Sequence, residues 1–117
     1  MKIYVSTGLV KNKTTPKIAN DLIKNKICDI EFSSGKFEKD ILKKIKRLNI
    51  NPQIHNYFPV PKKPFIINLA STNTKIFNQT MKHIKRSINF SKEINAKYFS
   101  FHAGFLVDPS IKDFGKC

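Results

Sequence analysis

The side chains best suited to chemistry in this sequence are two histidines, His55 and His102, which end short apolar runs at residues 53–55 and 97–102. If these runs are neighbouring parallel strands, which lie about 4.8 Å apart, the two imidazoles come within roughly 5 to 10 Å of each other. That separation suits one shared divalent ion, because imidazole is a common ligand of zinc, manganese and cobalt. A histidine in such a place is as often only a hydrogen-bonding residue, so spacing alone leaves both roles open.

Polar side chains also mark the other strands that the sequence predicts. Ser6 follows the first apolar run, Glu31 lies in the second, and Asn56 and Tyr57 come directly after His55. In parallel barrels the active site is built at the carboxyl ends of the strands, so these four positions are candidates for a substrate site. For Glu31 the alternative of equal weight is a buried carboxylate that pairs with a lysine.

These side chains need a scaffold that brings the ends of separate strands together. Short apolar runs alternate with amphipathic segments in the order βαβαβαβ, which predicts a parallel sheet with crossover helices. Thr15 suits the N-cap of the first helix and Pro16 its first turn, and Ser71, Thr72 or Asn73 suit the cap of the third. The expected strands are residues 2–5, 29–32, 53–55 and 97–102, and the expected helices begin near residue 15 and cover 37–48 and 76–94.

The same order of elements occurs in open doubly wound sheets and in barrels. Neither GxGxxG nor GxxxxGK[ST] follows the first strand, which disfavours a nucleotide-binding doubly wound fold and favours a barrel. Closing a barrel takes about eight strands and roughly 250 residues. Residues 1–117 are therefore expected to form one α/β domain, the amino-terminal half of a (β/α)8 TIM barrel truncated after its fourth strand.

Several side chains have expected environments that a structure can test. Tyr98 and the phenylalanines, including Phe37, are expected in the core. Cys28 is expected to be buried at the start of a strand, without a disulfide to Cys117. His83 lies beside the apolar stripe of the third helix and is expected at the surface or its boundary.

The formal net charge of the chain is +14 at pH 7. Nearly all of the positive charge is lysine distributed over several predicted helices, whereas phosphate-binding surfaces usually enrich arginine. A nucleic-acid partner is therefore a secondary expectation beside a small molecule. No apolar run reaches the roughly 20 residues of a membrane-spanning helix, and the start lacks the pattern of a secretory signal, so the expected location is the cytoplasm, away from membranes.

Three segments together resemble a known family. IHNYFP (54–59), FIINLAS (65–71) and FSFHAG (99–104) are similar to the xylose-isomerase-like superfamily, which includes sugar phosphate isomerases and epimerases and endonuclease IV-type AP endonucleases. In that family a histidine follows the third strand, INLAS or INLG comes next, and FHxG ends the fourth. The resemblance spans residues 2–104. It implies that His55 and His102 belong to a metal site, that Asn56 and Tyr57 lie near the substrate, and that Glu31 contacts the substrate or its pocket.

The function that this resemblance implies is an isomerase or epimerase that acts on a sugar or sugar phosphate with a divalent metal (Zn, Mn, Co or Mg). The metal would polarise adjacent carbonyl and hydroxyl oxygens while a glutamate base from a later strand moves a proton. Strands five to eight, with the remaining ligands and that base, are absent, so the chain is expected to be inactive alone. The alternatives are an AP endonuclease that hydrolyses DNA phosphodiesters with zinc, and a non-catalytic half-barrel that dimerises through its open sheet edges.

Overall fold

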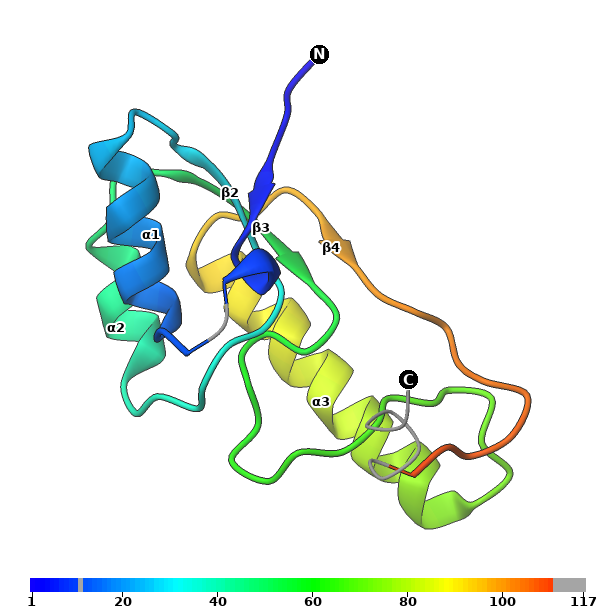
Figure 1. Cartoon of the computed structure of the whole chain (residues 1–117). Helices are drawn as coiled ribbons and strands as arrows, with labels where there is room; N and C mark the ends of the chain where they lie inside the picture. The colour runs from blue at the N-terminus through cyan, green and yellow to red at the C-terminus, as the bar shows by residue number, and fades with distance from the viewer. Residues whose placement is uncertain (11, 111–117) are drawn as a thin grey trace.

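The computed structural model describes residues 1–10 and 12–110 and has an α/β fold built on a four-stranded sheet (Figure 1). The strands are parallel and lie in the order β1-β2-β3-β4, so each strand pairs with the next one in the chain. The predicted βαβαβαβ order is confirmed. The strands are β1 (Val5–Ser6), β2 (Asp29–Phe32), β3 (Asn51–His55) and β4 (Phe99–Ser100); the helices are α1 (Thr15–Lys24), α2 (Ile41–Lys46) and α3 (Thr74–Glu93), with a 3-10 turn η1 (Thr7–Leu9) after β1.

The helix boundaries follow from local sequence signals. Thr15 is the first residue of α1 and not its cap as predicted, since the N-cap is Thr14. Pro16 occupies the first turn, where its missing amide hydrogen costs no hydrogen bond. Asn73 caps α3, because its side chain accepts hydrogen bonds from the backbone amides of Lys75 and Ile76 at 3.0 and 3.3 Å. Helix α2 starts later than the predicted residue 37 because Asp40 has a left-handed backbone (φ 58°), which interrupts a helix. Of the helices described, none has the length and apolar character to cross a membrane.

The two outer strands are shorter than the sequence predicts. Residues 2–5 were expected to form the first strand and 97–102 the fourth, but only Val5–Ser6 and Phe99–Ser100 pair with a neighbour. An outer strand has one neighbouring strand, so its backbone hydrogen bonding ends where that neighbour is no longer within reach. The inner strand β3 instead extends two residues further back than expected, to Asn51.

The core lies between the sheet and the three helices. Ile30, Phe32 and Ile54 alternate with more exposed residues along β2 and β3, so their side chains share one face of the sheet. Against that face pack residues of all three helices and the ring of Phe58, which follows β3. The helix contributions to this cluster are Ala19 of α1, Ile45 of α2 and Phe90 of α3, with Ile94 at the end of α3.

The opposite face of the sheet is polar. Ser6, Glu31 and Gln53 are partners in register on β1, β2 and β3. Side chains alternate along a strand, so Glu31 and Gln53 point away from the face that carries Ile30. His55 lies two residues after Gln53 and shares the polar face. In the described part of the chain the helices all pack against the other face, and this one remains uncovered.

Several predicted side-chain environments are wrong. Among the phenylalanines expected in the core, Phe77, Phe101 and Phe105 are 38%, 42% and 38% exposed. Tyr98 is 64% exposed because its neighbour Phe99 pairs with Ile54 and packs on the core, which turns Tyr98 the other way. Phe37 is 45% exposed, since it precedes α2 instead of lying within it. Cys28 is exposed and free, and Cys117 lies outside the described residues. His83 is only 5% exposed, because α3 turns it toward the segment after β3.

Candidate functional site

His55 and His102 lie side by side at the carboxyl ends of β3 and β4. Their ring centroids are 5.2 Å apart and the rings meet edge to face, with an interplanar angle of 85°. The predicted proximity of the two imidazoles is thus confirmed. Among residues 1–10 and 12–110 no group of three or more His, Cys, Asp or Glu side chains forms a candidate metal cluster, so the two imidazoles are a pair and not a complete ligand set.

Ser100 fixes the orientation of the His55 ring. The Nδ1 atom of His55 lies 2.9 Å from the hydroxyl of Ser100, the residue directly opposite in register on β4. The backbone of the same serine accepts a 2.7 Å hydrogen bond from the amide of Asn56. A neutral imidazole that donates its Nδ1 hydrogen to Ser100 keeps a lone pair on Nε2, which is the arrangement found in metal-ligating histidines.

The segment that carries His102 is held by the buried side chain of Asn68. Its Oδ1 atom accepts hydrogen bonds from the amides of Phe105 (2.9 Å) and Ala70 (3.1 Å). Its Nδ2 donates to Asp108 Oδ1 at 2.7 Å, and its backbone amide donates to the Thr80 hydroxyl at 3.1 Å. The side chain of Asn68 therefore connects the INLAS segment to the FHAG segment by hydrogen bonds, and these bonds fix the position of the backbone that follows β4.

Gly104 is required by the same contact. A Cβ atom on Gly104 would lie 2.4 Å from Asn68 Oδ1 and 2.9 Å from the amide nitrogen of Ala70. The first distance is far below a normal van der Waals contact, and Asn68 is only 1% exposed and cannot move aside freely. The glycine of the FHAG segment thus allows two backbones to approach closely.

A hollow of about 510 Å³ lies beside the two histidines. Its walls are mostly apolar, and among its lining residues are His102 and the polar side chains of Asn56 and Tyr57. Small-molecule sites are usually apolar concavities with a few polar groups, and this hollow has that composition. The rest of its lining is Ile66, Ile67, Gly104 and Phe105.

Asn56 and Tyr57 differ in what they can offer a ligand of this hollow. The Asn56 Oδ1 atom is buried and has no hydrogen-bond partner in the described residues, so in this arrangement it is unsatisfied and closed to a ligand. The Tyr57 hydroxyl accepts a 2.7 Å hydrogen bond from the amide of Ile67. Burial raises the pKa of Tyr57, more than that hydrogen bond lowers it, so the hydroxyl keeps its proton at neutral pH and can donate it to a ligand.

Ser6 and Glu31 do not line this hollow. The Ser6 hydroxyl lies 2.9 Å from that of Ser33 and accepts a 3.3 Å hydrogen bond from the Gly8 amide, so it organises the turn after β1. Glu31 lies one strand away from His55 on the polar face. The lysine partner considered for Glu31 is absent from the ion pairs of the described residues.

His83 of α3 contacts two of the residues around the hollow. Its Nε2 atom lies 3.2 Å from the carbonyl oxygen of Asn56, to which it donates, and its ring packs against Tyr57 and Phe65. Burial lowers the pKa of His83; the hydrogen bond to Asn56 opposes this effect, and the charge of Arg86 adds to it. The folded protein therefore holds His83 neutral where the unfolded chain would protonate it.

This difference predicts a loss of stability in mild acid. Above the unfolded-state pKa of about 6.5, His83 is neutral in both states and its titration does not affect folding. Below that pH the unfolded chain binds a proton that the folded protein does not, so the free energy of unfolding falls. We expect the urea midpoint of unfolding to fall between about pH 7.5 and pH 5.5, and to fall less in His83→Gln, which retains a donor for the Asn56 carbonyl. Equal slopes in the two proteins would contradict this assignment.

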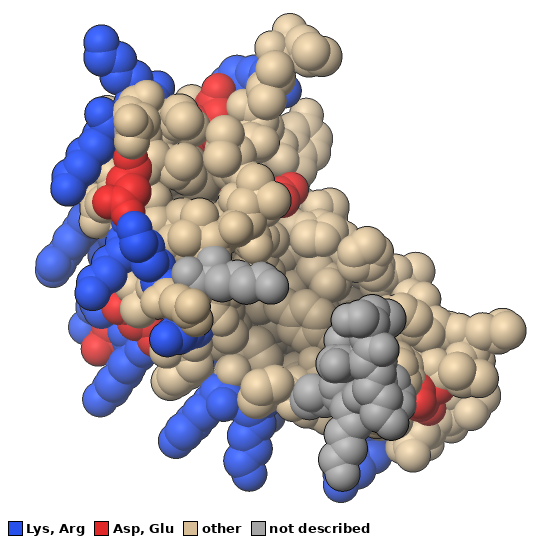
Figure 2. All heavy atoms as spheres, viewed as in Figure 1, with Lys and Arg blue, Asp and Glu red and all other residues tan. Residues whose placement is uncertain are grey.

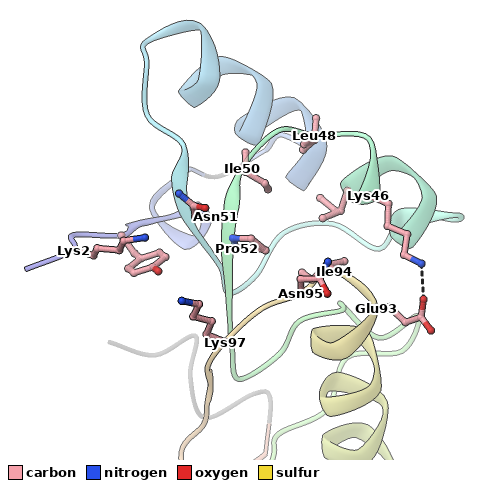
Figure 3. A pocket seen from close by; sticks show the side chains of 12 residues that line it. Lys2, Lys46, Leu48, Ile50, Asn51, Pro52, Glu93, Ile94, Asn95 and Lys97 are labelled. Carbon is pink, nitrogen blue, oxygen red and sulfur yellow. Dashed lines mark hydrogen bonds and ion pairs between the residues drawn. The ribbon is translucent and has the colours of Figure 1, made fainter.

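A second hollow, of about 310 Å³, lies at the amino ends of the strands (Figure 3). Lys2, Lys46 and Lys97 lie around it, and Lys46 forms a 2.5 Å ion pair with Glu93. No histidine lines it. The two ends of the sheet therefore differ: the amino ends are polar and cationic, and the carboxyl ends carry the imidazole pair and the apolar hollow.

Sequence reasoning missed four residues that position this site. Asn68 was visible within INLAS but gave no sign of being a buried hydrogen-bonding hub. Ser100 lies within an apolar strand, and Asp108 follows the last recognisable motif, so neither stood out. His83 fell beside an apolar stripe, and only the three-dimensional path of the chain after β3 shows that its ring meets the Asn56 carbonyl.

Comparison with known proteins gives a fold and no family. No protein-family model matches the sequence, and no curated protein does. Among solved structures, the chain is similar to the TTHB071 protein from Thermus thermophilus, in a structure obtained by soaking with ZnCl2, with a TM-score of 0.67 and 14% identical residues. The match covers 97% of this chain and 44% of that one, so the chain spans less than half the length of the protein it resembles.

Proposed function

We propose that this chain is part of a divalent-metal-dependent isomerase or epimerase of the xylose-isomerase-like superfamily, which acts on a sugar or sugar phosphate. The observation that carries the proposal is the His55–His102 pair beside a hollow lined by Asn56 and Tyr57. In this proposal the imidazoles hold the metal and Asn56 and Tyr57 contact the substrate, for which the Asn56 side chain has to turn its buried amide oxygen toward the hollow.

The strand order supports a barrel. Doubly wound sheets reverse their strand order at a switch point, whereas the order β1-β2-β3-β4 proceeds in one direction, as it does around a (β/α)8 barrel. All helices pack on one face of the sheet, and the other face is polar and ends in His55. We infer that the four strands are the first half of a barrel whose interior is the polar face. The coverage of TTHB071, 44% of its length, fits a half.

The residues present fit part of a metal site. His55 and His102 are close enough to share one ion, and Ser100 orients the His55 ring so that Nε2 is available. A bound divalent ion would polarise the carbonyl and the neighbouring hydroxyl of a sugar. Tyr57 would orient the sugar by donating a hydrogen bond, and Asn56 would line the pocket beside it.

The chain by itself is proposed to bind substrate without turning it over. Isomerisation needs a base that moves a proton between adjacent carbons, and in the described residues no carboxylate lines the hollow. Glu31 lies on the neighbouring strand and does not reach it. In the proposed whole enzyme the base comes from another strand.

The charge distribution favours an uncharged sugar ring over DNA as the ligand of this hollow, and a sugar phosphate would have to place its phosphate outside these lining residues. No lysine or arginine lines the hollow, and residues 98–110, of which His102, Gly104 and Phe105 line it, contain neither. Cleavage of DNA requires contacts to a highly charged phosphate backbone, for which cations are the usual partners. The AP endonuclease alternative therefore has less support at this position.

Saturation-transfer NMR on the full chain tests the proposal, with aldoses, ketoses and their phosphates as probes and ZnCl2 or MgCl2 as metal. We expect signals from one class of sugar only with metal present, and none from His102→Ala. Asn89→Ala, a substitution at an exposed position of α3, serves as the matched control and should keep the signals. Signals that survive EDTA, or the absence of any sugar signal with metal-loaded protein, would overturn the proposal.

A further inference from the structure

The positive charge of this protein is concentrated on the helices. Residues 13–26, 36–47 and 74–93, which comprise α1, α2, α3 and their flanks, contain 15 of the 22 Lys and Arg and 4 of the 8 Asp and Glu. Because all three helices cover the same face of the sheet, cations that are distributed along the sequence gather on one side of the molecule. We name this surface the helix layer.

Figure 2 shows the asymmetry. Blue side chains project along the edge that α1 and α2 form in Figure 1, whereas the visible surface over β4 and the segment after it has none. The sequence agrees, because residues 98–110 contain one acidic residue, Asp108, and no cation. The hollow lined by His102 and the helix layer are therefore different parts of the surface.

Neighbouring carboxylates neutralise little of this charge. Three ion pairs are described, and they use Asp21, Glu38 and Glu93, each with one lysine. The lysines of these pairs are Lys13, Lys44 and Lys46. Most of the cations of the helix layer consequently face solvent without a carboxylate partner among the described residues.

Helix α3 exposes cations over most of its length, namely Lys75, Lys82, Lys85, Arg86 and Lys92. Ile84 and Ser87, which face inward, are buried. The helix spans 20 residues, or about 30 Å, which is close to one turn of a DNA duplex. Its only acidic residue, Glu93, lies at its carboxyl end and is paired with Lys46.

We propose that the helix layer binds the phosphate backbone of a nucleic-acid duplex, independently of the histidine site and without sequence preference. A duplex carries about one negative charge per 1.7 Å of its axis, so a cationic surface about 30 Å long displaces several condensed counterions at once. Membrane binding is the less favoured partner, because surface-bound helices usually insert large apolar side chains between lipids. Helix α2 exposes Lys43, Lys44 and Lys46 and no apolar side chain, and the large apolar side chains that the helix layer exposes, Phe37, Phe77 and Ile88, are each more than half covered.

Fluorescence anisotropy of the full chain with a labelled duplex of about 20 base pairs measures this binding across a range of salt concentrations. Contacts to about four phosphates would give a slope of roughly −3.6 in log affinity against log salt. Lys82→Glu, Lys85→Glu and Arg86→Glu combined should weaken binding at least tenfold and flatten the slope. Circular dichroism checks folding, and the three Gln substitutions replace the Glu set if that variant unfolds.

The matched control changes the same amount of charge at residues outside the helix layer. Lys62→Glu and Lys63→Glu lie in the loop after β3, and Lys97→Glu lies after α3 at the amino-end hollow, which Lys46 also lines. Binding that stays within about twofold of the parent protein supports the proposal. An equal loss in both triple variants would show that net charge alone matters and would overturn it. Binding to vesicles with anionic lipid but not to the duplex would also overturn it, in favour of a membrane partner.

Discussion

Replacing His55 and His102 together by alanine should weaken zinc binding by at least about a hundredfold, since removal of a group that merely orients a ligand already costs ten- to a hundredfold. The two imidazoles lie 5.2 Å apart, and the proposed ion has no other described ligand that would compensate for them. Isothermal titration calorimetry with ZnCl2 measures the affinity. Both cysteines should first be changed to serine, because Cys28 is an exposed thiol and thiolates bind zinc on their own.

A graded series separates ligation from general damage. Ser100→Ala removes the partner of His55 Nδ1 without removing a ligand, and we expect a loss of about tenfold in zinc affinity. Each single histidine substitution should fall between Ser100→Ala and the double variant. Zinc affinity that is unchanged in the double histidine variant would place the metal elsewhere and would remove the main support for the isomerase proposal.

Gly104→Ala should lower the free energy of unfolding by about 3 kcal/mol, through steric overlap with a buried group and the hydrogen bonds that the group then loses. The added methyl would lie 2.4 Å from Asn68 Oδ1, the atom that accepts from the amides of Phe105 and Ala70. Urea unfolding followed by circular dichroism measures the change.

Two further variants show whether that contact is the cause. Ala103→Gly changes the neighbouring residue without adding an atom and should cost only about 1 kcal/mol, from the greater freedom of the unfolded chain. Combining Gly104→Ala with Asn68→Ala removes both sides of the overlap, so the double variant should lose less stability than the two single variants added together. Strict additivity would contradict a direct contact between the two residues.

The sequence predicts the order of elements because each relies on a local period. Alternation indicated β2, and the spacing of apolar residues indicated α3, whose cap at Asn73 is also a local signal. The closeness of His55 and His102 followed from one further step, the parallel pairing of β3 with β4. That step requires only strand spacing and direction, so it was within reach of the sequence.

What the sequence could not supply depends on contacts between distant segments. The bond from His83 to the Asn56 carbonyl joins residues 27 positions apart, and the bond from Asn68 to Asp108 joins residues 40 positions apart. Neither leaves a local pattern, since a polar residue that is buried and satisfied looks in the sequence like an exposed one. The exposed position of Tyr98 has the same origin: the register of β4 decides which of two adjacent aromatic rings faces the core.

The polar face of the sheet sets a condition on any polypeptide that covers it. Glu31 and Gln53 lie on that face, so a covering layer has to offer them hydrogen-bond partners or ordered water. An apolar surface would leave their polar groups without hydrogen bonds. The outer strands β1 and β4 are each two residues long and expose few backbone groups for pairing. A separate polypeptide that covered this face would therefore adhere weakly and leave a hydrated junction, whereas a covering segment in the same chain would be held in place by its linkage.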